Sequence, residues 1–240
     1  MVTSLSFLAS NKDTPIIILG IIIIILTVVS LSYYFRKELV ILRKLKKIPL
    51  KRIGSLRTNQ LEKIYGNVLH VHAPLIAPLS KRKCVFYSIK LEVKKSNGKN
   101  SYWKTLINDE NIQTFFIEQN GNLAIVKPIQ NPKNYKSFLI VDKKDHSGKF
   151  NDPTPEFESL LKTYKINPIG WFGFNKALRY TEGIIEIGEK ITVAGIVKWS
   201  TLNEPIPGYS YSKIVSLVST DKQHIIITDS PKAFTSNSVL

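Results

Sequence analysis

The most constraining feature of the sequence is an apolar run from Thr14 to Phe35, which contains no charged residue. A helix of this length matches the hydrocarbon core of a bilayer, which is roughly 30 Å thick. Its many isoleucines favour strands in water, but a backbone inside lipid must satisfy its own hydrogen bonds, so a helix is expected there. A Tyr-Tyr pair stands near its end, where amphipathic rings prefer the membrane interface. The run therefore predicts a transmembrane helix.

Two other interpretations of this run are weaker. A buried core strand would be far shorter, and a cleaved signal peptide would have a basic start, a shorter apolar core and small residues at its cleavage site. Here Lys12 is offset by Asp13, and the run ends in bulky Tyr-Tyr-Phe. We therefore expect residues 1–13 to form a short external N-terminus and the anchor to remain uncleaved.

Positive charge is distributed unequally about the anchor. One lysine precedes it, and a cluster of cations follows it: Arg36, Lys37, Arg43, Lys44, Lys46, Lys47, Lys51 and Arg52. Lysine and arginine are in excess on the cytoplasmic flanks of membrane helices. The chain is therefore predicted to be single-pass, with its N-terminus outside and its C-terminal domain in the cytoplasm. The same cations are predicted to lie at the membrane surface, where anionic lipid headgroups attract each of them by about 1 kcal/mol.

The basic juxtamembrane segment covers residues 36–58, and its first part predicts a continuation of the anchor helix. Apolar residues recur every three positions at Leu39, Leu42, Leu45 and Ile48, which is a helical stripe, and a proline follows. The stripe fits two roles equally well. It can lie on anionic lipid as part of a basic amphipathic helix, or it can pack on the chain's own domain while the charges act only as a topology signal.

Residues 59–230 are predicted to form one β-rich domain. Apolar runs with period two recur across it, and turn signals separate them, most clearly Asn120-Gly121 between two such runs. The same pattern predicts hairpins at Ser96–Asn100 and at Gly188-Glu189. The fold class is therefore one N-terminal transmembrane helix plus a mainly-β domain with one or two short helices. That domain is a small barrel or sandwich, and an OB-like barrel is one form it can take.

Two short helices are predicted inside the soluble part. The residues around Leu160 place their apolar side chains on one helical face. Residues 53–70 suggest a second helix, because Asn59 and Glu62 have the spacing of a capping box and Gly66 stands where a helix would stop.

Residues suited to chemistry are few. The chain shows no P-loop, dinucleotide-binding fingerprint, zinc-protease motif or nucleophile elbow, so neither a cofactor nor a metal is predicted. His70 and His72 would share one face of a strand, but no third ligand is evident nearby, so a surface position is favoured. The preceding cations, Lys81–Lys83, would favour a thiolate at Cys84. Free cysteine is usually buried packing, however, and no base is placed beside it, so a catalytic cysteine is the less favoured alternative.

The net charge of +16 admits anionic lipid, nucleic acid or acidic proteins as partners. Much of the excess lies beside the anchor, where topology explains it, so nucleic acid is not the expected partner. Trp103, Trp171 and Trp199 are expected in the core. Arg179 and Glu182 are expected to pair with each other or with nearby loops.

Two segments carry motifs of a known family. The first, Gly66 to Val93, contains Ala-Pro-Leu-Ser before Cys-Val-Phe-Tyr, and the second, Leu178 to Trp199, contains Glu-Gly-Ile before Gly-Glu-Lys-Ile-Thr-Val-Ala-Gly. Together they resemble the GIDE domain, also called the beside-a-membrane domain, which is known from a mitochondrial outer-membrane ubiquitin ligase and from many bacterial and archaeal membrane proteins. The matching positions are Pro78, Ser80, Cys84, Tyr87, Arg179, Glu182, Gly188 and Gly195.

Two departures limit what the resemblance implies. Ligase members add a RING finger that binds zinc through several cysteines, whereas this sequence has one cysteine. Mitochondrial members also have a second membrane helix after the domain, where residues 231–240 form a short polar tail here. The resemblance therefore implies a non-catalytic, membrane-proximal binding or scaffold module with an unidentified protein partner. The alternatives are a ligase-like role shared with RING-containing relatives and a membrane enzyme that uses Cys84.

Overall fold

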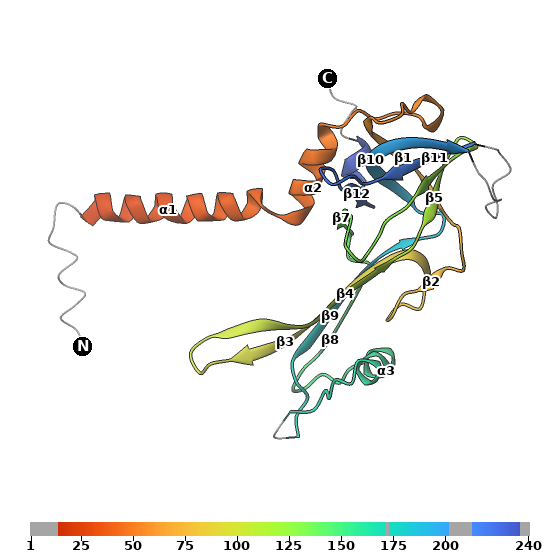
Figure 1. The fold of residues 1–240 in the computed structure, drawn as a ribbon. Helices are drawn as coiled ribbons and strands as arrows, with labels where there is room; N and C mark the ends of the chain where they lie inside the picture. The colour runs from red at the N-terminus through yellow and green to blue at the C-terminus, as the bar shows by residue number, and fades with distance from the viewer. Residues whose placement is uncertain (1–13, 171–172, 202–212, 236–240) are drawn as a thin grey trace, which may run out of the picture.

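The structure is a computed structural model that describes residues 14–170, 173–201 and 213–235. It begins with helix α1, Thr14–Tyr34, whose large apolar side chains are exposed. At 1.5 Å per residue α1 is about 31 Å long, which matches the thickness of a hydrocarbon core. Within the described part of the chain, α1 is the one helix that is long and apolar enough to cross a membrane. The predicted apolar helix is therefore confirmed, and it projects away from the rest of the molecule (Figure 1).

The predicted continuation of the anchor helix is wrong. Phe35 and Arg36 interrupt the helix, and Arg36 has φ −56° and ψ 135°. A separate helix, α2 (Lys37–Lys46), then runs at a steep angle to α1 (Figure 1). The interruption turns the apolar side of α2 toward the domain, where Ile41 and Leu45 are buried. A straight extension of α1 would hold these side chains away from the domain.

The centre of the domain is a closed barrel. Its strands are β1 (Leu61–His70), β5 (Phe115–Gln119), β6 (Asn122–Val126), β10 (Lys190–Thr201) and β11 (Lys213–Val218). The ring closes because β1 pairs with both β5 and β10, while β11 joins β10 to β6. The β6–β11 pairing is parallel and the others are antiparallel. Numbered along the chain, the barrel strands follow the order 1-2-3-5-4-1, which is the order of an OB-type barrel.

Two further strands extend the barrel wall. β12 (Ile225–Thr228) pairs with the first half of β10, and β7 (Tyr135–Phe138) pairs in parallel with β12. The interior is filled by fully buried apolar side chains that include Ile64, Phe115 and Val193. Because apolar burial contributes about 25 cal/mol per Å², this core is the main source of the barrel's stability.

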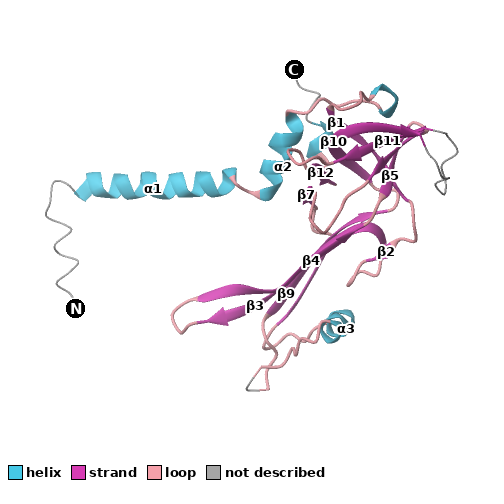
Figure 2. Ribbon diagram, viewed as in Figure 1, coloured by secondary structure: helices cyan, strands magenta, loops and turns pink. Residues whose placement is uncertain are grey.

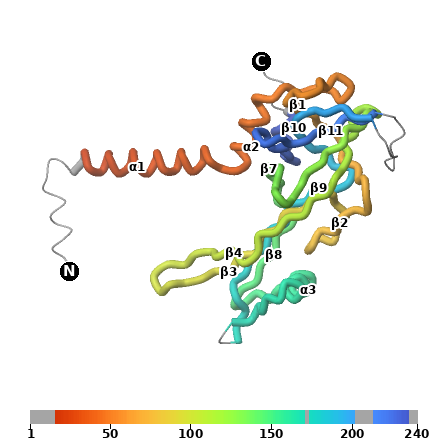
Figure 3. Tube along the Cα trace, viewed as in Figure 1, coloured from red at the N-terminus to blue at the C-terminus, as the bar shows by residue number. Residues whose placement is uncertain are grey.

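Two long insertions between barrel strands build a second sheet. The β1–β5 connection supplies β2 (Leu75–Ile76), β3 (Lys83–Ser96) and β4 (Ser101–Ile112), and the β6–β10 connection supplies β8 (Lys143–Ser147) and β9 (Leu178–Glu186). β3 pairs with β2, β4 and β9, and β9 also pairs with β8. The strands extend from the barrel as an arm, with the β3–β4 hairpin at its end (Figure 2). The tube trace shows that segments far apart in the sequence run side by side along it (Figure 3).

Helix α3, Pro155–Thr163, packs against the arm and confirms the helix predicted around Leu160. Phe157 and Leu160 are buried in a cluster that includes Tyr180 of β9. The Thr154 hydroxyl caps the helix by accepting a hydrogen bond from the Phe157 amide at 3.2 Å.

The helix predicted over residues 53–70 is wrong. Ile53–Ser55 form a single 3-10 turn, and the rest of the span leads into β1. β1 is a strand because β5 and β10 satisfy its backbone hydrogen bonds along its two edges, which outweighs the capping-box spacing. Gly66 permits a close approach of strands and does not stop a helix. A Cβ atom there would lie 2.2 Å from the backbone oxygen of Glu118.

The predicted hairpins have different outcomes. The turn at Asn120-Gly121 joins β5 to β6, and the turn between Ser96 and Ser101 joins β3 to β4, so both are confirmed. The third prediction is right about two strands joined by a turn, and wrong only about the pairing of these strands with each other. Gly188 does adopt a turn conformation, with φ +87°, but β9 pairs in the arm and β10 pairs in the barrel. This turn therefore carries the chain from one sheet to the other.

Candidate functional site

The juxtamembrane cations do not form one uniform surface. Six of them are exposed, namely Arg36, Lys37, Lys44, Lys46, Lys47 and Arg52, and two are half-buried, namely Arg43 and Lys51. The Arg43 guanidinium donates to the backbone oxygen of Tyr34 at 2.7 Å and stacks over its ring, 3.6 Å from the ring centre. Arg43 therefore stabilises the junction between α1 and α2.

α2 is attached to the barrel by apolar packing and by polar contacts at both of its ends. Its buried side chains share one cluster with the barrel and with helix α4 (Lys232–Thr235): Ile41, Leu45, Ile48, Ala194, Ile226 and Ala233. Lys63 of β1 is fully buried, and its ammonium donates to the backbone oxygen of Leu45 at 3.0 Å. Burial lowers the pKa of Lys63. Glu38 and Lys232 form an ion pair at 2.8 Å.

This packing shows where the apolar stripe lies, and it does not test whether the charges contact lipid. The apolar side of α2 lies on the chain's own domain, while Lys44, Lys46 and Lys47 face outward. The tail after residue 230 also contributes, since α4 begins there and packs against α2.

A basic pocket of about 370 Å³ lies between α2, β7 and the turn before β12. Its charged and titratable lining consists of Lys44, Lys47, Lys136, Lys222 and His224. The two lysines of the α2 region were predicted at the membrane surface. No local pattern predicts the other three residues at this place, because strand pairing brings them from distant parts of the chain.

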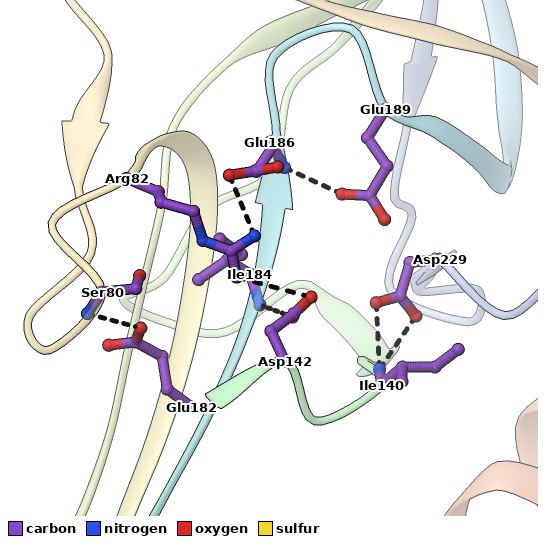
Figure 4. A network of polar contacts seen from close by, with 9 residues as sticks. All are labelled: Ser80, Arg82, Ile140, Asp142, Glu182, Ile184, Glu186, Glu189 and Asp229. Atoms are coloured by element: carbon purple, nitrogen blue, oxygen red, sulfur yellow. Dashed lines mark hydrogen bonds and ion pairs between the residues drawn. The ribbon is translucent and has the colours of Figure 1, made fainter. Parts of the chain in front are cut away.

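The two family-like segments meet at one buried carboxyl group. Glu182 of β9 is fully buried and accepts hydrogen bonds from the amides of Leu79 and Ser80, at 2.8 and 3.0 Å, and from the Tyr180 hydroxyl at 3.0 Å. Burial, followed by the charge of Glu182, raises the pKa of Tyr180, so the hydroxyl remains a donor. Glu182 thus fixes the loop that contains Pro78 to the arm sheet (Figure 4).

Further carboxyl groups surround this point and bind neighbouring backbone amides (Figure 4). Asp142 accepts from the Ile184 amide at 2.9 Å, and Asp229 accepts from the Ile140 amide. Arg82 pairs with Asp142 and with Glu186, at 3.6 and 3.2 Å. These contacts hold the segments where the arm meets the barrel, which is a structural role. Sequence reasoning missed Asp229, although an acidic residue directly after the apolar run Ile225–Thr228 was a usable signal.

Asp229 is the most strongly perturbed acid of this network. Burial raises its pKa to about 7, the Ile140 amide opposes the shift, and the charges of Glu189 and Asp142 add to it. Burial also raises the pKa of Glu189, which accepts a hydrogen bond from the Glu186 amide at 2.9 Å.

Cys84 is not a reactive thiol. It is fully buried on β3, and burial raises its pKa to about 12, with the charges of Glu182 and Glu186 adding to the shift. The expectation that neighbouring cations favour a thiolate is wrong, because Arg82 is the one cation that lowers the pKa, and its effect is smaller than that of burial, of the two carboxylates and of the Phe86 backbone hydrogen bond. Tyr87, half-buried on the same strand, also has a pKa raised by burial.

His70 and His72, the two histidines considered as metal ligands, are exposed. His70 lies at the end of β1 and His72 in the bend after it. Among the described residues, no group of three or more His, Cys, Asp or Glu side chains is placed to hold a metal ion.

The remaining predicted positions are structural. Arg179 pairs with Glu92 and stacks over Trp103, 4.2 Å from the ring centre, so it does not pair with Glu182. Gly195 is buried on β10, close to β11. The expected core positions are wrong for Trp103 and Trp199, which are 36% and 41% exposed, and Trp171 lies outside the described residues.

Comparisons of the chain with protein-family models, with curated proteins and with solved structures found no match. The resemblance to the GIDE domain therefore rests on the motif positions alone. The main candidate sites are the outward face of the α2 region and the basic pocket beside it.

Proposed function

We propose that the chain is a single-pass membrane protein whose barrel and arm form a non-catalytic binding or scaffold module on the cytoplasmic face of the bilayer. The observation that carries this proposal is the direct attachment of the barrel to the span. Only Phe35 and Arg36 separate α1 from α2, and α2 packs on the barrel. A domain attached in this way stays beside the membrane that α1 crosses. The bilayer, with its anionic headgroups, is thus the first proposed partner, and an unidentified protein is the second.

The β3–β4 hairpin supports a position close to lipid. Its outer part, from Val93 to Thr105, contains four lysines and no acidic residue. Tyr102 and Trp103 are exposed there, and such rings prefer the membrane interface. The hairpin also extends to the same side of the barrel as α1 (Figure 1).

The resemblance to the GIDE domain supports the same proposal, because that domain stands beside a membrane in its known members. Ser80 and Glu182, which come from the two separate family-like segments, are joined by a hydrogen bond. The proposal does not extend to ubiquitin-ligase activity, since Cys84 is the single cysteine and a RING finger needs several. The burial of that thiol also argues against an enzyme that uses it as a nucleophile.

A reporter fused after Leu240 tests the proposed orientation. We expect it to behave as cytoplasmic, because the cations that follow α1 retain that side of the chain inside. The same reporter fused before Met1 is the matched control and should behave as external. Activity of the C-terminal fusion on the external face alone would contradict the proposal.

A further inference from the structure

Basic side chains converge in the pocket beside α2, and no carboxylate is described among its lining residues. Lys44, Lys47, Lys136, Lys222 and His224 line it. None of the four lysines forms an ion pair within the described part of the chain. Like charges that converge in this way repel one another, and a bound anion would relieve the repulsion.

The C-terminal end of α2 explains the positions of two of these lysines but not of the other two. Lys44 and Lys47 lie in the last turn and at the C-cap of α2, where cations complement the helix dipole. Lys136 belongs to β7 and Lys222 to the turn before β12, so the dipole of α2 does not account for their presence. Loss of solvation, followed by the nearby ammonium of Lys136, lowers the pKa of Lys44. Lys44 and Lys136 are therefore close enough to interact unfavourably.

The size and walls of the pocket indicate the kind of anion. Its volume of about 370 Å³ suits a small molecule better than a bare ion, since small-molecule sites occupy roughly 300–1,000 Å³. Apolar side chains of Ile48, Leu61 and Ile226 form part of its wall, which suits a ligand with an uncharged body. Lysine is a common point-charge partner of phosphate. The pocket also lies beside α2, which directly follows the span.

We propose that this pocket binds a phosphate-bearing anion, supplied either as the headgroup of a lipid in the adjacent leaflet or as a soluble phosphate ester. The inference deepens the proposed function, because it names a ligand for a membrane-proximal module. Lys44 and Lys47 approach the phosphate from α2, and Lys136 and Lys222 approach it from the barrel wall.

Binding to the full-length protein in neutral detergent micelles tests this proposal. The probes are short-chain phosphatidylinositol 4-phosphate, its free headgroup inositol 1,4-bisphosphate, and inorganic phosphate. We expect the double variant Lys136→Glu/Lys222→Glu to weaken binding of the tightest probe at least tenfold. The double variant Lys143→Glu/Lys144→Glu changes the net charge equally, but both residues are exposed on β8 and neither lines the pocket, so the affinity for the probe should fall less than twofold.

Comparing the affinities of the lipid and of its free headgroup identifies the source of the ligand. Tighter binding of the lipid than of its free headgroup, by tenfold or more, identifies a membrane lipid, and equal binding identifies a soluble phosphate ester. Lys136→Gln/Lys222→Gln, with an unchanged unfolding temperature, should also weaken binding and excludes misfolding as the cause. Failure of all three probes to bind, or equal losses in the two charge-reversed variants, would overturn the proposal. Neither result affects the reporter experiment, so the orientation is tested separately.

Discussion

Replacing Glu182 with alanine should cost more stability than any other single side-chain deletion at the junction of arm and barrel. Its carboxyl group is fully buried and satisfies the amides of Leu79 and Ser80 and the hydroxyl of Tyr180. Deletion leaves three donors without their partner in a place that water does not reach. Hydrogen bonds to charged groups contribute roughly 1.5–3 kcal/mol each, but deletion also removes the cost of burying the carboxylate, so we expect a total loss of about 3–5 kcal/mol.

Thermal unfolding of the full-length protein in detergent micelles measures this loss, which corresponds to a fall in Tm of roughly 6–20 °C. Glu186→Ala is the matched control, because Glu186 lies on the same strand but is partly exposed and forms its ion pair with a partly exposed Arg82. Such pairs contribute about 0–1 kcal/mol. Glu182→Gln keeps the volume and one acceptor, so it should fall between the two. Equal Tm values for the two alanine variants would show that Glu182 does not hold the junction together.

Stability should also fall as the pH rises from about 4 to about 7, because of Asp229. Its pKa is about 7 in the folded chain, above the value of about 3.9 that an aspartate has when unfolded. Between these values the folded state binds the proton and the unfolded state does not, so folding is favoured below pH 4 and this contribution is lost by pH 7. A shift of about three pKa units corresponds to at most about 4 kcal/mol.

Asp229→Asn removes this pH dependence, because the amide keeps an acceptor for the Ile140 amide without an ionisable group. The variant should be more stable than the parent at pH 8 and close to it at pH 4, as measured by unfolding at a series of pH values. Asp221→Asn is the control, since Asp221 is exposed and should leave the profile of the parent unchanged. A constant difference between Asp229→Asn and the parent across this range would contradict the assignment.

The sequence predicted the parts of the fold that depend on local periodicity. The strands of the hairpins at Asn120-Gly121 and Ser96–Asn100, and helix α3, follow from alternation, turn residues and one apolar face. The failures arose where pairing between distant segments outweighs a local signal. β1 carries a capping-box spacing, yet it is a strand because β5 and β10 border it. The Gly188 turn looked like a hairpin because the sequence does not show that its two strands enter different sheets.

The candidate sites were likewise predictable where they depend on local sequence, and not where distant segments meet. The lysines of the α2 region were predictable from their position after an apolar run, whereas Lys136 and Lys222 join them only through the β7–β12 pairing. For Cys84 the preference for buried packing is confirmed, and only the expected thiolate is wrong, because the charges of chain neighbours do not describe the surroundings of a buried side chain. Side chains alternate along a strand, so Lys83 is exposed while Cys84 is fully buried.

The packing of α2 on the barrel supports the proposal that the domain stays beside the bilayer. Hydrogen exchange of the full-length protein in nanodiscs tests it most directly, with lipids that are either neutral or anionic. The structure predicts that amides of α2 from Ile41 to Lys46 are protected to the same degree as those of β1 in both kinds of disc, because the packing that protects them belongs to the protein. Rapid exchange of α2 in neutral discs, slowed only by anionic lipid, would show instead that the helix lies on the membrane and that the barrel is not fixed to the span.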